Sequence, residues 1–174
     1  GELANEWRGF KFWSENQEPR TEHVCVLCDG NRQIERFIVS WDPSDGYDQI
    51  EVEVDCPLCE GYDSDKNPLL EEYVDCLHFI LSIGLELKVK MPYIIGDYEA
   101  PNVIRQFDFV FEDISKLARA TRNEYEESMI SGIYDETVRG ILGLGRLLGF
   151  TWEQIEQAYF DKNKVNHERQ ENGY

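Results

Sequence analysis

The chain has 174 residues, of which 41% are hydrophobic, and this is enough for one domain with a real core and a small insertion. Its 35 acidic and 17 basic residues give a formal net charge of −18. This charge excludes a broad electrostatic grip on nucleic acid, because such binding depends on neutralising phosphates. The longest apolar run, Cys76 to Leu85, is too short to span a bilayer, and no signal-peptide pattern is found. We therefore expect no membrane partner and a cytoplasmic location.

A first helix is predicted from Gly1 to about Glu15, ending before Pro19. Leu3, Trp7 and Phe10 have helical apolar spacing within it. The segment "GELANEWRGFKFW" shows no initiator Met and no helix N-cap. We therefore expect that the chain begins inside a helix and that a leading segment is missing.

Residues 21–67 form a different kind of segment, because they lack helical periodicity. Strand-like "ERFIVSW" and alternating "QIEVEV" are separated by the turn-rich "DPSDGYD". The sequence therefore predicts a small β module, inserted into a helical domain made of residues 1–20 and 68–174.

Helices follow this module to the end of the chain. Pro68 suits the first turn of the second helix, and the loop from Met91 to Pro101 separates that helix from a third. The remaining helices are predicted at 103–120, 135–148 and 151–170, the last opened by a capping box of Thr151 and Gln154. The predicted fold is an all-α bundle of about five helices that carries a zinc-ribbon-like β module.

Two CxxC pairs flank the predicted strands of the module. Cys25 and Cys28 form one pair, Cys56 and Cys59 form the other, and 27 residues lie between the pairs. Paired thiolates at this spacing are typical of a structural zinc site, which would have no open position for catalysis. Two disulfides or a thioredoxin-like redox site are the alternatives. The fifth cysteine, Cys76, is most simply a core residue.

The module is strongly acidic, with twelve Asp or Glu residues against three Lys or Arg residues in 21–67. Such a segment repels phosphate backbones. We therefore expect a protein partner, a subunit contact or a lid at this module in place of nucleic acid.

Carboxylates occur at short helical steps on two predicted helices. Glu72 and Asp75 lie three residues apart at the start of an almost wholly apolar helix, whereas Glu2 and Glu6 lie four apart on the first helix. Burying an unpaired carboxylate costs several kcal/mol, so a cation must offset that cost. An Arg or Lys from another helix is one candidate, and Mg²⁺, which prefers oxygen ligands, is the other.

The last predicted helix carries a stripe of hydrogen-bond donors. In "YFDKNKVNHERQENGY" these residues recur at steps of three and four, on one face. They are Tyr159, Lys162, Asn163, Asn166, Arg169, Gln170 and Gly173. Together with the acids, this stripe indicates a bundle that binds a polyphosphate.

These residues resemble the dimeric all-α dUTPases, part of the all-α nucleoside triphosphate pyrophosphatase superfamily that includes MazG-like enzymes. Glu72 and Asp75 match the ExxD motif of that superfamily, and Glu2 matches the second acid of its ExxE motif, whose first acid would precede Gly1. The ending is similar to YxxKNxxNxxRQxxGY, up to and including Tyr174, and "FKFW" is similar to a segment lining the nucleotide pocket.

The resemblance implies hydrolysis of dUTP, and also of dUDP, to dUMP by a homodimer. It implies Mg²⁺ at Glu2, Glu72 and Asp75, with Glu6 as a further possible ligand. The residues implied to bind substrate are Lys11, Trp13, Tyr159, Lys162, Asn163, Asn166 and Arg169. The alternatives are the same fold acting on dCTP or another nucleotide, and a regulatory protein-binding module on an inactive scaffold.

Overall fold

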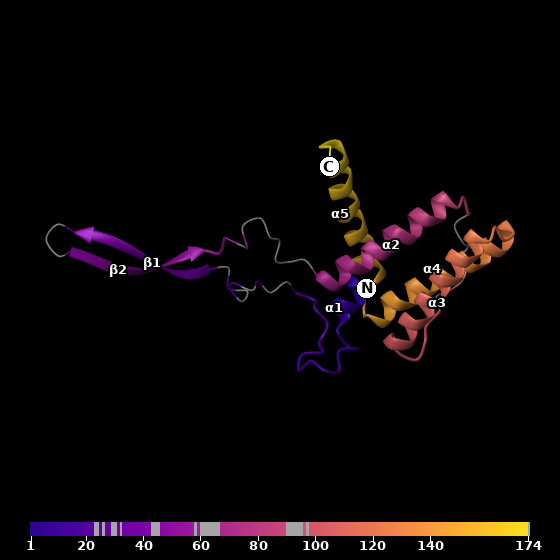
Figure 1. Ribbon diagram of the computed structural model, residues 1–174, viewed down its shortest axis with the longest axis horizontal. Helices are drawn as coiled ribbons and strands as arrows, with labels where there is room; N and C mark the ends of the chain where they lie inside the picture. Colours follow the sequence, from indigo (N-terminus) through magenta and orange to yellow (C-terminus); the bar gives the residue numbers. More distant parts are fainter. Residues whose placement is uncertain are drawn as a thin grey trace. The chain divides into compact units, whose positions relative to one another are not determined.

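The computed structural model describes residues 1–22, 25, 27–28, 31, 33–42, 46–57, 59, 67–89, 96 and 98–173, and only the backbone of strand residues 37–42 and 46–50. The chain divides into two compact units, Gly1–Arg20 with Leu69–Tyr174 and Thr21–Pro68. Helices make up the first unit and a two-stranded sheet lies in the second (Figure 1). The predicted fold class, an all-α bundle with a small β module, is confirmed.

The helical unit contains five described helices. They are α1 (Glu2–Trp7), α2 (Pro68–Glu86), α3 (Val103–Arg122), α4 (Glu127–Leu147) and α5 (Trp152–Glu171). Helices α3 and α4 pack side by side (Figure 1). None of the described helices combines the length and the apolar character that a membrane span needs.

Helix α2 supplies much of the core. Leu69, Tyr73 and Val74 are each at most 1% exposed, and Tyr73 donates a hydrogen bond to the Ile141 carbonyl of α4 at 3.1 Å. The sequence predicts a central helix, apolar on nearly every side. In the single chain, however, Phe79 and Leu85 on α2 remain exposed.

The first helix is much shorter than predicted. Helix α1 ends at Trp7 because Arg8 adopts a left-handed conformation with φ 61°, while its backbone N–H still bonds the Ala4 carbonyl. The Arg8 guanidinium then donates to the Asn16 carbonyl at 2.8 Å and to Ser14 Oγ at 3.3 Å. These bonds stabilise a loop in the part of the chain where the apolar spacing predicted a helix.

The fourth helix begins earlier than predicted, at Glu127, and ends at Leu147. Ser and Gly residues weaken the helical signal of its first turns. Ile130 and Ile133 in those turns nevertheless pack against the core, and this tertiary packing outweighs the low local propensity. In α5 the capping box is confirmed: Thr151 Oγ1 accepts from the Gln154 N–H, and the Gln154 side chain accepts from the Thr151 N–H.

The buried side chain of Gln106 joins the segment before α3 to α4. Its amide group donates to the carbonyls of Tyr98 and Gly140 and accepts from the Ala100 N–H. This satisfies the buried amide and fixes residues 98–100 against α4. Part of the predicted loop, Met91–Ile95 with Asp97, lies outside the described residues.

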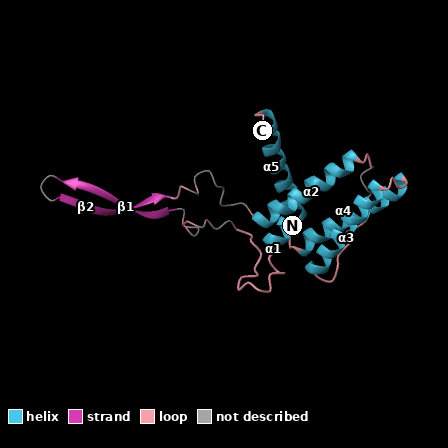
Figure 2. Cartoon of the chain, viewed as in Figure 1, coloured by secondary structure: helices cyan, strands magenta, loops and turns pink. Residues whose placement is uncertain are grey.

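The β unit contains a hairpin of β1 (Gln33–Asp42) and β2 (Gly46–Asp55), drawn in magenta in Figure 2. The strands are antiparallel, with Gln33 opposite Asp55 and Asp42 opposite Gly46. Both predicted strands are therefore present. A two-stranded hairpin is at best marginally stable alone, so this unit requires a further stabilising element.

Two glycines of α4 give opposite expectations for substitution by alanine. A Cβ on Gly143 would overlap the Tyr98 carbonyl oxygen and lie 2.7 Å from its carbon, whereas a Cβ on Gly132 would meet nothing within 4 Å. We expect Gly143→Ala to lower the free energy of unfolding by about 1–3 kcal/mol, through displacement of the Gln106 network. Gly132→Ala should raise it by up to about 1 kcal/mol.

Urea unfolding of both variants, followed by circular dichroism, measures these changes. A Gly143→Ala variant as stable as the Gly132→Ala variant would contradict the close packing of Tyr98 on α4.

Candidate functional site

The start of α2 lies beside α1, and this brings acids from the two helices together. The Leu69 N–H donates to the Arg20 carbonyl at 3.1 Å, so the chain after α1 returns to the first turn of α2. Leu3 of α1 and Leu69 belong to one core cluster. Glu2 and Glu72 consequently lie close enough for the charge of one to act on the other.

Glu72 is in an unfavourable electrostatic environment. Burial raises the pKa of its carboxyl group, and the negative charges of Glu2, Asp75 and Glu71 raise that pKa further. Lys162 acts in the opposite direction. The predicted acids therefore gather at one end of α2, and their mutual repulsion favours a bound cation.

Lys162 of α5 is the cation that the structure places at these acids. Its Nζ donates to Asp75 Oδ2 and to Glu71 Oε1, both at 3.0 Å. Although burial opposes the charged amine, the hydrogen bonds to Asp75 and Glu71 raise the pKa of Lys162 above its usual value. The lysine partner considered in the sequence analysis is therefore present for Asp75.

A ring stack lies next to this ion-pair group on the same two helices. His78 of α2 and Tyr159 of α5 have ring centroids 4.1 Å apart and an interplanar angle of 8°. His78 Nδ1 is 3.0 Å from the Val74 carbonyl oxygen. Lys162 and Tyr159 are thus both held by α2.

The other predicted residues of α5 differ in exposure along the helix. Asn163 and Asn166 are half-buried, whereas Arg169, Gln170 and Gly173 are exposed near the C-terminal end. Tyr174 lies outside the described residues. The stripe therefore extends outward from Lys162 along α5.

The loop after α1 presents the predicted Lys11 and Trp13. Trp13 is 65% exposed and packs edge-on against Phe10 and Phe12, while Lys11 Nζ lies 5.9 Å from the centroid of the Phe10 ring. These contacts are internal to the loop. They do not bring Lys11 or Trp13 to the acids of α2.

Glu6 has a partner of its own. Its Oε1 lies 3.3 Å from Arg20 Nη1, and its carbonyl oxygen accepts from the Arg20 N–H at 2.9 Å. These bonds anchor the chain that returns to α2. They also orient the Glu6 carboxylate toward a basic residue.

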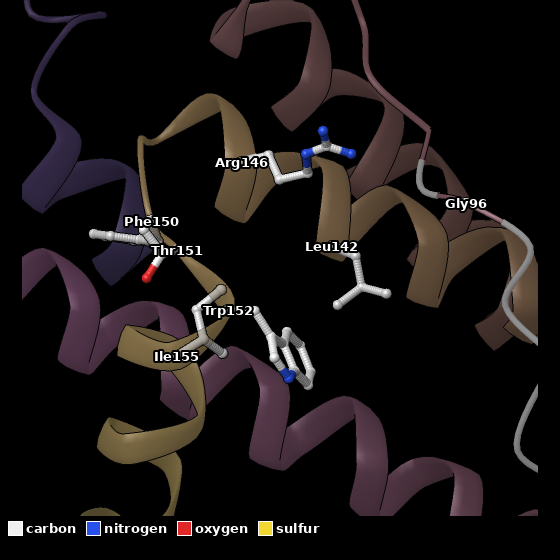
Figure 3. Close-up of a pocket in the computed structure, with 7 residues that line it drawn as sticks. All are labelled: Gly96, Leu142, Arg146, Phe150, Thr151, Trp152 and Ile155. Atoms are coloured by element: carbon white, nitrogen blue, oxygen red, sulfur yellow. The ribbon is translucent and has the colours of Figure 1, made fainter.

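A separate cavity of about 430 Å³ lies between α4, the start of α5 and Gly96 (Figure 3). Leu142 and Trp152 point into it, and the Arg146 side chain lies at its edge (Figure 3). Arg146 Nε is 3.1 Å from Glu99 Oε1. None of the predicted site residues lines this cavity.

The four module cysteines converge as predicted. Their Sγ atoms all lie within 4.8 Å of one another, with 3.8 Å between Cys25 and Cys56 and 3.4 Å between Cys28 and Cys59. All four are free thiols. Among the described residues, this is the one group of three or more potential ligands that converges in this way, and it could hold a metal such as zinc.

The local backbone and the neighbouring thiols perturb two of these cysteines in opposite directions. Hydrogen bonds from the backbone of Leu27 and Cys28 lower the pKa of Cys25 to about 6. A side-chain hydrogen bond with Cys28, together with burial, raises the pKa of Cys59 to about 12. A backbone that already stabilises one thiolate suits a metal knuckle, because the thiolate is the form that binds metal.

The sequence reasoning missed two residues of the α2–α5 contact, Glu71 and His78. Glu71 lies four residues before Asp75 and His78 lies three after it, so their common face was readable from the sequence. What the sequence lacked was the partner on α5. The periodicity of one helix does not identify the helix that packs against it.

The dUTPase family model matches residues 60–174, well over half of the chain. The match contains Glu72, Asp75 and all of α5, whereas α1, Cys25, Cys28, Cys56 and Cys59 lie before it. No curated protein and no solved structure matches the chain.

The cysteine geometry predicts a metal-dependent pattern of thiol reactivity. We expect a thiol-specific reagent to modify Cys25, Cys28, Cys56 and Cys59 only after a chelator has removed a bound ion, because ligated thiolates are protected. A Cys76→Ser variant should show the same four chelator-dependent thiols. If a reductant exposed these thiols to the reagent and a chelator did not, the result would contradict metal binding and indicate disulfides.

Proposed function

This chain belongs to the dUTPase family, and from that premise we propose that it is a Mg²⁺-dependent enzyme converting dUTP, and also dUDP, to dUMP. The coarser conclusion, a dUTP-hydrolysing enzyme of the all-α type, follows from the family match. The finer proposal is supported chiefly by one observation, the gathering of Glu2, Glu72 and Asp75 at the end of α2 that contacts Lys162.

The chemistry of the donor set suits the proposed ion, although the carboxylate oxygens do not converge as closely as the four cysteine Sγ atoms do. Carboxylate oxygens are ligands that Mg²⁺ prefers, and the mutual repulsion of the acids is what a divalent cation offsets. When bound, Mg²⁺ would supply neutralisation of the phosphate oxygens during attack by water on the α-phosphorus. Glu2, Glu72 and Asp75 would hold it. Glu6, which pairs with Arg20, is left out of this proposed ligand set.

The stripe on α5 would bind the polyphosphate. Lys162 and Arg169 would stabilise the negative charge that accumulates on the leaving pyrophosphate, and Asn163, Asn166 and Tyr159 would fix its orientation. Lys162 lies beside the acids and near the start of this stripe, so it would adjoin both the ion and the phosphates. Lys11 and Trp13 would contact sugar or base.

We further propose a homodimer and a structural zinc ion. Exposed apolar side chains on α2 and α3, among them Phe79, Leu85 and Phe111, would be covered by a second copy of the chain. The all-thiolate cysteine group would hold zinc, which would stabilise the hairpin unit. The acidic hairpin unit would contact a protein partner.

The proposed activity depends on the acid at position 75. We expect Asp75→Asn to lower Mg²⁺-dependent pyrophosphate release from dUTP by about 100-fold or more, as found when a charge-stabilising group is lost from an active site. Glu86→Gln is the matched control, because Glu86 is an exposed acid at the other end of α2. Full activity of Asp75→Asn would remove Asp75 from the metal site.

The same assay with dCTP, dTTP and UTP tests the base and sugar specificity. Preferential turnover of dCTP would support the alternative nucleotide specificity. Absence of turnover with every nucleotide, in the presence of Mg²⁺, would favour the regulatory alternative.

Lys162 and a metal ion should compete for Asp75. We expect Lys162→Met to bind Mg²⁺ more tightly than the unmodified protein when no nucleotide is present, because the acids lose the amine that offsets their charge. The same variant should hydrolyse dUTP more slowly, since it lacks a phosphate ligand. Isothermal titration with MgCl₂ measures the first effect, and weaker Mg²⁺ binding by Lys162→Met would contradict the competition.

A further inference from the structure

Helix α5 has few anchors on the rest of its unit. It spans 20 residues, yet Ile155 in its first turn is its one buried residue, with Ala158 and Tyr159 partly buried against the core. Its C-terminal end stands apart from the other helices (Figure 1). The orientation of its donor stripe therefore depends on a small number of side-chain contacts.

Two of these contacts form an ordered pair on α2. Tyr159 meets His78, and Lys162, one turn later on α5, meets Asp75, one turn earlier on α2. The two contacts therefore follow opposite orders along the two helices. Because both contacts involve steps of three residues, a rotation of α5 that breaks one also displaces the other.

The His78 ring is itself fixed by α2. The Val74 carbonyl is an acceptor, so His78 Nδ1 carries the hydrogen in the 3.0 Å bond between them. The ring is therefore held flat against Tyr159 in a defined orientation. This gives His78 the role of a rigid platform for the Tyr159 ring.

The second ring nitrogen of His78 does not account for the presence of a histidine at this position. Nε2 is buried and has no hydrogen-bond partner within the described residues. An unpaired buried polar atom is unfavourable, so the contribution of His78 in this structure comes from its ring face and from Nδ1.

We propose that His78 is a positioning residue of the enzyme, which acts by stacking on Tyr159 and so sets the rotation of α5 that directs Lys162 to the acids. The inference deepens the proposed function, because the consequence concerns the phosphate-binding stripe. In this role His78 itself does not contact the substrate. It acts through Tyr159 and Lys162.

Three variants of α2 test the role of the ring. His78→Ala removes the stack, His78→Phe keeps an aromatic ring without the nitrogens, and Ser82→Ala changes an exposed neighbour on the same helix as a control. We expect His78→Ala to raise the KM for dUTP and the inhibition constant of inorganic pyrophosphate by about 10- to 100-fold, the range for a small misplacement of binding groups. His78→Phe should restore both constants to within about threefold of the unmodified protein.

Amide hydrogen exchange of α5 provides a readout that does not depend on activity. In His78→Ala, exchange should become faster after Ile155 and remain unchanged in α3 and α4, whereas His78→Phe should protect α5 as the unmodified protein does. The exchange result does not depend on dUTP hydrolysis. If the unmodified protein did not hydrolyse dUTP, the proposed function would be wrong, whereas the positioning role of His78 would remain. If His78→Ala unfolds, Tyr159→Leu breaks the same stack from α5 and is measured by amide exchange alone, because Tyr159 is itself proposed to contact the phosphates.

Two results would overturn the proposal. One is unchanged kinetics and unchanged α5 exchange in His78→Ala. The other is a His78→Phe variant as impaired as His78→Ala, because the ring face would then not be the feature that acts.

Discussion

Repulsion among carboxylates at the first turns of α2 is the constraint on which the site depends. Glu72 and Asp75 lie near Glu71 and Glu2, and in a half-buried position such a group is unfavourable without a positive charge. Lys162 supplies that charge and, because it comes from α5, it also ties the last helix to the second. One electrostatic requirement therefore determines where the donor stripe lies relative to the acids.

The parts that the sequence predicted are local in origin. The acids at 72 and 75 share a face because of helix periodicity, the capping box of Thr151 and Gln154 joins residues three apart, and each CxxC pair forms one knuckle. The convergence of the two knuckles was also predictable, since a hairpin of two equal strands returns the chain to its start.

The parts that could not be predicted arise from contacts between distant residues. Helix α1 ends early because the Arg8 side chain reaches Asn16, a bond that apolar spacing does not reveal. Helix α4 starts early because Ile130 packs against the core. Likewise, the partners of Lys162 and His78 follow from how α2 and α5 cross, and that crossing is a property of the packed bundle.

Arg20 and Leu69 are one backbone hydrogen bond apart, so the helical scaffold is closed at the point where the cysteine-bearing segment leaves and rejoins it. The entropic cost of a longer loop between two such fixed points grows only slowly with its length. The scaffold can therefore accommodate segments of very different size here without rearranging its acids. In evolutionary terms, the cysteine-bearing hairpin can be gained, lost or exchanged while selection on hydrolysis continues to act on the helices alone.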